Sequence, residues 1–251
     1  MSALSAKQGT TPKPAISSPA RAGPTIRAAL RYVRATPELA VPLALMALVG
    51  TLGFNFQVVL PLLARFSFDG GASTYGVLVA AMAVGSILGA LVNGAHGRTG
   101  PPLIGAGALA FGILALLCGA MPSLALEIPV LAGLGAAAVT FAATVNSTLQ
   151  LAVSAEMRGR VMALYSVVFL GSTPIGGPIA GFLSEAFDPR AALLLAASAA
   201  LSAAWASRVA FGRLENRRAA SAADRTRCPP ARGPANSLPA AWRTNSRAST
   251  T

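Results

Sequence analysis

Six long apolar segments, separated by short turns, constrain this chain more than any other feature of its sequence. The segments cover residues 41–64, 75–95, 103–121, 124–153, 161–187 and 191–211. Each approaches or exceeds the ~20 residues that an α-helix needs to cross the hydrocarbon core of a bilayer. Because the turns are short, consecutive helices should run antiparallel. The sequence therefore predicts an all-α integral membrane bundle of six transmembrane helices, with the lipid bilayer as its solvent.

The composition agrees with a membrane protein and argues against a nucleic-acid-binding one. Of 251 residues, 54% are hydrophobic and 11% are charged, whereas soluble domains carry about 25% charged residues. The formal net charge is +12, but the basic residues are concentrated in the two ends and the turns. We find no basic patch interleaved with aromatic residues in a soluble domain, so the sequence predicts no nucleic-acid partner.

Polar segments precede and follow the six apolar segments. Residues 1–24 are rich in Pro, Ser and Ala and lack the apolar core of a signal peptide, so they are predicted to be a disordered cytoplasmic segment. Residues 25–38 read as a basic amphipathic linker helix on the anionic inner leaflet. The bundle occupies residues 39–211. Residues 212–251, rich in Ala, Arg, Pro and Ser, are predicted to form a disordered, basic cytoplasmic tail.

The positions of Lys and Arg predict the orientation. If both termini are cytoplasmic, 18 of the 20 basic residues lie on the cytoplasmic side, among them Arg98, Arg158 and Arg160 in the short turns. The opposite side then keeps only Arg65 and Arg190. This bias satisfies the positive-inside rule and predicts a multi-pass protein of the inner (cytoplasmic) cell membrane.

Glycine and proline residues mark two segments for helix packing or gating. In the fifth segment they interrupt the apolar run, and Gly177 and Gly181 share one face at a spacing that allows another backbone to approach. The alternatives of a static packing groove and a moving gate are both open. The residues of this group are Gly85 and Gly89 in the second segment and Pro174, Gly177, Pro178 and Gly181 in the fifth.

Three stretches together resemble major facilitator superfamily permeases, in the branch that includes the enterobactin exporter and many bacterial drug or siderophore efflux proteins. They are residues 156–181 (EMRGRVMALYSVVFLGSTPIGGPIAG), the linker-like residues 27–39 and the helix-7-like residues 55–64. The resemblance runs from Arg27 to Phe211 and covers the C-terminal six-helix half of such a permease. It implies secondary efflux of a small lipophilic or siderophore-like molecule by alternating access between two six-helix halves.

The partner of this half is predicted in two alternative ways. A separate N-terminal six-helix half, or a second copy of the chain, would complete the cavity. Alternatively, the chain is a truncated or split half-permease that acts only as a structural partner of another half. In either case we expect no transport by the monomer alone, since alternating access needs one half to move against the other.

Uncharged polar residues inside the apolar segments are the candidates for a substrate cavity. The resemblance places the first and fourth segments along the central cavity. The polar side chains could also serve only as interhelical hydrogen bonds, worth about 0.6 kcal/mol each. The candidates are Asn55, Gln57, Asn146, Gln150 and Tyr165.

The sequence argues against an enzyme. The lone His96 lies in a turn, no His, Cys and acid cluster has metal-ligand spacing, and no GxxxxGK[ST] loop is present. We therefore expect no catalytic residue, no metal and no cofactor. Glu127 and Glu185 fall near the outer ends of their segments, where solvation at the membrane interface would account for them. The sequence thus predicts no proton relay in this half.

Overall fold

The computed structural model describes residues 25–97 and 99–227, and these residues form helices joined by short connections. In chain order the elements are α1 (Thr25–Ala35), α2 (Pro37–Gly53), α3 (Phe56–Leu62), the π-helical η1 (Leu63–Ser67), α4 (Ala72–His96), α5 (Pro101–Ala120), α6 (Leu124–Ala152), α7 (Arg158–Ala186) and α8 (Pro189–Arg227). The predictions for residues 1–24, for residue 98 and for residues 228–251 lie outside the described residues.

Six of the described helical segments are long and apolar enough to cross a membrane, which confirms the predicted all-α bundle. They are Pro37–Ser67, Ala72–Ala95, Pro101–Ala120, Leu124–Ala152, Arg158–Ala186 and Pro189–Arg217. Each overlaps one predicted segment, and the ends differ by a few residues. The first span differs in kind, because it consists of α2, α3 and η1 rather than one helix.

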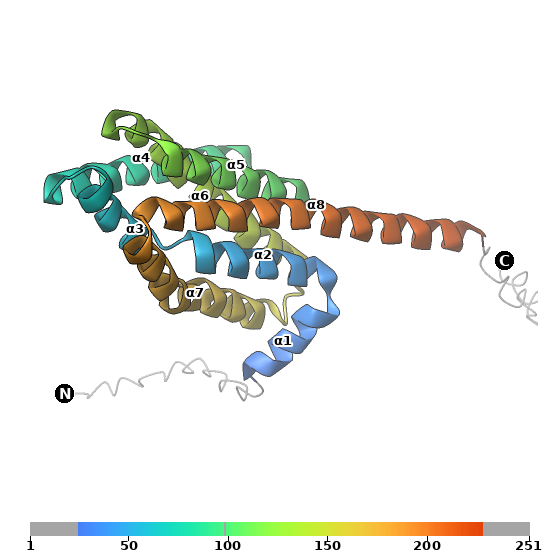
Figure 1. Ribbon diagram of the computed structural model, residues 1–251. Coiled ribbons are helices and arrows are strands. Elements are labelled where there is room, and N and C mark those ends of the chain that lie inside the picture. Colours follow the sequence, from blue (N-terminus) through green and yellow to red (C-terminus); the bar gives the residue numbers. More distant parts are fainter. Residues whose placement is uncertain (1–24, 98, 228–251) are drawn as a thin grey trace, which may run out of the picture.

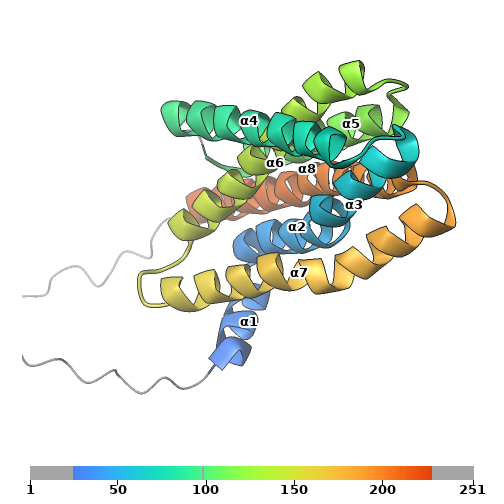
Figure 2. The ribbon, with the colours of Figure 1, turned by 90° about the vertical axis from the view of Figure 1, so that its left-hand side faces the viewer.

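The helices pack side by side in a bundle (Figures 1 and 2). The most extensive pairings are α5 with α8 and α4 with α6, while α2 lies against both α7 and α8. The core between these helices is apolar, and its largest side chains include Phe111, Phe141 and Met46, all fully buried. Burial of such side chains against neighbouring helices provides the dispersion contacts that hold membrane bundles together.

Helix α1 is amphipathic and covers Thr25–Ala35 of the predicted linker, residues 25–38, whose role as a linker stays a prediction. Ala29 and Val33 are buried, and α1 packs against α7 and α2, whereas Arg27 and Arg31 are exposed. The helix ends at Ala35, and α2 begins at Pro37, because a proline lacks the N–H group that would continue the first helix but fits the first turn of the next.

The prediction of a disordered tail from residue 212 is wrong for residues 212–227, because α8 continues through them to Arg227. Figure 1 shows this helix running past the ends of its neighbours. The segment is rich in Ala and Arg, which are strong helix formers, and it extends a helix that the bundle has already nucleated. Low hydropathy was therefore a poor guide to disorder here.

Glycines bring α4 and α6 into backbone contact. A Cβ at Gly89 would lie 2.6 Å from the carbonyl oxygen of Ala136, and one at Gly85 would collide with the carbonyl oxygen of Ala132. From the other side, a Cβ at Gly135 would collide with the carbonyl oxygen of Met82. Small residues on both helices thus allow the close approach that is typical of membrane helix pairs.

Two spans leave most of their surface outside the bundle. In the most apolar window of α4 only 17% of residues are buried, and in that of α7 22%, whereas the other four spans reach 44–56%. The exposed side chains on α4 and α7 are large and apolar, such as Leu91 and Leu170. These surfaces face lipid or another apolar partner.

Candidate functional site

The first span is interrupted where α2 gives way to α3, at Phe54 and Asn55. Both residues leave the helical conformation, with φ/ψ of −91°/33° at Phe54 and −97°/33° at Asn55. The Asn55 backbone oxygen accepts hydrogen bonds from the N–H groups of Val58 (3.0 Å) and Val59 (3.1 Å), which starts α3. An irregular backbone inside a membrane is tolerated only where protein groups satisfy it or where it lines a cavity.

The side chain of Asn55 holds this interruption together. It is 3% exposed, and its Nδ2 donates to the backbone oxygen of Thr51 at 2.7 Å. Its Oδ1 has no hydrogen-bond partner among the described residues. Gly176 of α7 packs directly on this point, since a Cβ there would lie 2.6 Å from Asn55 Nδ2 and would collide with the Thr51 oxygen. Asn55 therefore works as a structural hydrogen-bond donor with a free acceptor atom.

An aromatic cluster surrounds the interruption. The Phe54 ring lies 5.4 Å from that of Phe111, 6.2 Å from Phe169, and 6.4 Å from each of Phe56 and Phe141. These rings come from four different spans, so Phe54 joins them at one point. Aromatic pairs at such distances stabilise by about 0.5–1.5 kcal/mol beyond the area they bury. No regular spacing in the sequence pointed to this cluster, because its members are scattered along the chain.

A cavity of about 590 Å³ opens between the interrupted span and α4. Phe54, Phe56, Gln57, Leu60, Tyr75, Val79, Met82, Ala83 and Ser86 line it. Its wall is mainly apolar and aromatic, with the amide of Gln57 and the hydroxyls of Tyr75 and Ser86 as polar groups. Such a lining suits a lipophilic molecule that carries a few hydrogen-bonding groups. Of the predicted cavity residues, Gln57 lies in this wall.

Three other predicted residues form a separate polar group on α6 and α7. Gln150 donates a hydrogen bond to Asn146 one turn earlier, and the Asn146 side chain also interacts with Tyr165. The Tyr165 hydroxyl donates to the backbone oxygen of Ala142 at 3.4 Å. The Tyr165 ring stacks on Phe169 at 6.0 Å. Because Phe169 also contacts the Phe54 ring, aromatic side chains connect this polar group to the interrupted span.

The chain matches the family described as transmembrane secretion effector over residues 3–232, which is most of its length. It belongs to this family of major-facilitator-type permeases. No curated protein and no solved structure matches it. Together with the six apolar spans, the family makes this chain a multi-pass membrane transporter of the secretion effector type.

In this secretion effector the fifth span is one helix, α7, although the sequence suggested an interruption near its prolines. Pro174 and Pro178 both lie inside α7 and are exposed. Gly177 and Gly181 face Val58 of α3, and a Cβ at either would lie 3.8 or 3.6 Å from that side chain, which is ordinary contact. The tight approach between the first and fifth spans is one residue away, at Gly176.

The basic turn residues lie at the ends of the spans. Arg158 and Arg160 occupy the first turn of α7 and are exposed, and Arg160 Nη1 lies 3.4 Å from the Met157 sulfur. Arg98 lies outside the described residues. Exposed guanidinium groups at a helix end are compatible with the water–lipid interface.

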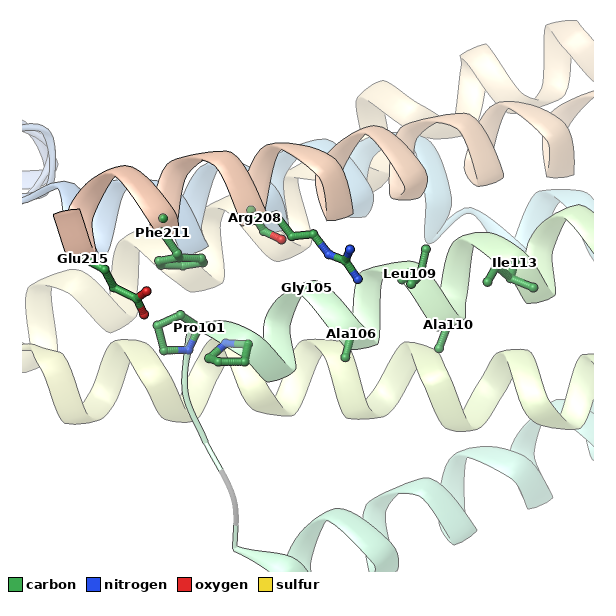
Figure 3. Close-up of a pocket in the computed structure, with 12 residues that line it drawn as sticks. Pro101, Gly105, Ala106, Leu109, Ala110, Ile113, Arg208, Phe211 and Glu215 are labelled. Carbon is green, nitrogen blue, oxygen red and sulfur yellow. The ribbon is translucent and has the colours of Figure 1, made fainter.

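A second cavity, of about 550 Å³, runs along the outside of α5 and α8. Figure 3 shows Phe211 and Arg208 of α8 reaching toward Pro101 and Gly105 of α5, with the Glu215 carboxylate near Pro101. The rest of its lining is apolar except for Ser207. The cavity shares no lining residue with the cavity at the interrupted span, so we treat the two separately.

The interpretation of Glu127 as an interfacial, solvated acid is wrong. Its side chain is 0% exposed, and neither carboxylate oxygen has a hydrogen-bond partner among the described residues. Glu185, in contrast, is exposed. A carboxylate that is buried without hydrogen-bond partners loses its hydration with little in return, wherever it lies along the helix. The position along the segment did not reveal that this side chain points inward.

Proposed function

We propose that this secretion effector exports a small lipophilic or siderophore-like molecule across the inner membrane by alternating access. The observation that carries the proposal is the aromatic cavity beside the interrupted span. Its volume of about 590 Å³ falls within the range typical of small-molecule sites. Substrate would lie against Phe54 and Tyr75, with Gln57 and Ser86 providing hydrogen bonds.

The interruption at Asn55 supports movement at this site. The short helix α3 continues from the break, and Val58 and Val59 bond to the Asn55 oxygen rather than continuing α2. Hinges in transporters are places where a few residues absorb a change in φ and ψ. We propose that α3 and η1 tilt about Phe54 and Asn55 and so open or close the cavity on one side of the membrane.

The exposed surfaces of α4 and α7 support a second bundle as the other wall of the transport path. These two spans bury the least surface in the structure, and α4 carries one wall of the cavity. We propose that an N-terminal six-helix half or a second copy of the chain lies against them. A structural partner role without transport is the alternative, and the same surfaces would support it.

The orientation is part of the proposal. The excess of basic residues at both ends and in two turns supports cytoplasmic termini in the inner membrane. The beginnings of α5 and α7 would then lie on the cytoplasmic side, and Arg65 and Arg190 on the outer side.

Filling the cavity tests the function. We expect Ala83→Phe to lower the efflux of ethidium from efflux-deficient cells at least tenfold, because the new ring would fill part of the cavity that Ala83 lines. Ala90→Phe is the matched control, since Ala90 is another exposed alanine of α4, two turns away and outside the cavity lining. Equal efflux by Ala83→Phe and wild type, at equal amounts in the membrane, would contradict a substrate site at this cavity.

A further inference from the structure

Glu127 is a fully buried carboxyl group that the proposed transport path does not use. It lies in the first turn of α6, and both of its oxygens lack hydrogen-bond partners among the described residues. Four residues earlier in the chain, Ser123 is exposed in the turn that connects α5 to α6. Ser123 therefore lies one helical turn, about 6 Å along the axis, before the Glu127 backbone.

The neighbours of Glu127 come from two other spans. The Cys118 side chain, near the end of α5, and Arg190, in the first turn of α8, are the groups that act on the carboxyl. Cys118 is buried and carries no disulfide. The other titratable side chains at this end of the bundle are all exposed, and they are Arg65, Asp69, Tyr75, Glu185 and Asp188.

This environment favours the neutral acid over the carboxylate. A buried carboxylate needs hydrogen bonds or a paired cation to offset the loss of water. The Cys118 side chain, Arg190 and the N-terminus of α6 attract the negative charge, but the side chain is fully buried and neither oxygen has a partner at hydrogen-bond geometry among the described residues. The neutral acid, in contrast, carries no charge that burial would strip of water, so it is the form that burial favours.

We propose that Glu127 is a proton-binding site of the transporter, loaded from the outer solution. The carboxylate takes up one proton when the α5–α6 turn opens to water, and it holds that proton as a carboxylic acid while α5, α6 and α8 are closed around it. When the site opens again, the acid releases the proton to water and returns to a carboxylate. No other reactant is needed. The link to transport rests on the proposed function, whereas proton binding itself does not.

Infrared spectroscopy of the purified protein tests proton binding without any transport. At neutral pH we expect the wild type to show a carbonyl band of a protonated carboxyl group. Glu127→Gln should abolish this band and fold normally, since glutamine is neutral and of the same size. Glu185→Gln should leave it unchanged, and Cys118→Ser should shift its frequency. A wild type without a band that depends on Glu127 would overturn the inference.

Transport in inverted membrane vesicles tests the coupling, with ethidium as the probe. We expect wild-type transport to collapse when the pH gradient is dissipated, and Glu127→Gln to lose at least tenfold of the gradient-driven rate while Glu185→Gln keeps it. Transport that ignores the gradient, or a Glu127→Gln variant that still follows it, overturns coupling through Glu127 and leaves the exporter function intact. If the wild type moves no probe, the proposed function fails and the infrared band alone decides whether Glu127 binds a proton.

Discussion

The first and fifth spans of the bundle both contain glycine and proline, but only the first is interrupted. The fifth span contains two prolines and two adjacent glycines in its second half, yet α7 is one helix from Arg158 to Ala186. The first span is interrupted at Phe54 and Asn55, one residue after Gly53 and six before Pro61. The composition of a membrane helix therefore does not determine where it breaks.

The difference arises from the groups that surround each position. At Asn55 a buried side chain bonds to the Thr51 oxygen, and Gly176 of the neighbouring helix leaves room for the irregular backbone. Pro174 and Pro178 face outward on α7, where their rings displace no neighbouring helix. A break thus forms where a neighbour accommodates it, and α7 serves as the straight support for the interrupted span.

The largest effect should come from removing the room that α7 provides. We expect Gly176→Ala to lower the free energy of unfolding in detergent by about 2 kcal/mol, because the new methyl group collides with the Thr51 oxygen and forces the two spans apart. Gly171→Ala is the control on the same helix. Its methyl group meets nothing within 4 Å, so higher helix propensity should make it neutral or stabilising. Equal thermal stabilities of the two variants would contradict a close contact at Gly176.

A smaller effect should follow from removing the side chain that holds the break. We expect Asn55→Ala to cost about 0.6–1.5 kcal/mol, because it deletes the hydrogen bond to Thr51. Hydrogen exchange at the Val58 and Val59 amides should also quicken. Gln57→Ala, at an exposed side chain two residues away, should change neither quantity. Unchanged exchange in Asn55→Ala would show that the break does not depend on this amide.

The smallest effect should come from the residues that looked most disruptive in the sequence. We expect Pro178→Ala to change stability by no more than about 1 kcal/mol, and in the stabilising direction, since α7 is already helical there and regains one backbone hydrogen bond. Circular dichroism and thermal unfolding in detergent would measure it. A large loss of stability would mean that the Pro178 ring packs against a partner and gives α7 its shape.

The sequence predicted the spans well because the bilayer imposes one dominant rule, a minimum apolar length. The sequence was a poorer guide to contacts between helices, because these depend on which side of each helix faces its neighbour. Glu127 was placed correctly near the end of its segment, but its inward direction depends on how α6 rotates against α5 and α8. The close contact at Gly176 was likewise expected one residue away, at Gly177, since two glycines in a row present different faces.

The substrate-cavity role of the polar residues stays a prediction, but their positions can be compared with the structure. Polar residues inside apolar segments were easy to identify, and the structure places Gln57 in the cavity wall and groups Asn146 with Gln150 and Tyr165. The aromatic cluster was not predicted, because its rings come from four spans. The helical continuation of α8 beyond residue 212 was not predicted either, because Ala-rich polar sequence suits both a disordered tail and a helix that an adjoining span has nucleated.

The glycine contacts between α4 and α6 have a mechanical consequence. At Gly85, Gly89 and Gly135 backbone packs against backbone, so at these points there is little side-chain volume that could change rotamer and let the helices slide. The pair should therefore move as one rigid plate. The cavity wall on α4, with Met82 and Ser86, would then move together with Asn146 and Gln150 near the end of α6. A rearrangement on one side of the membrane would thus be transmitted to the other side.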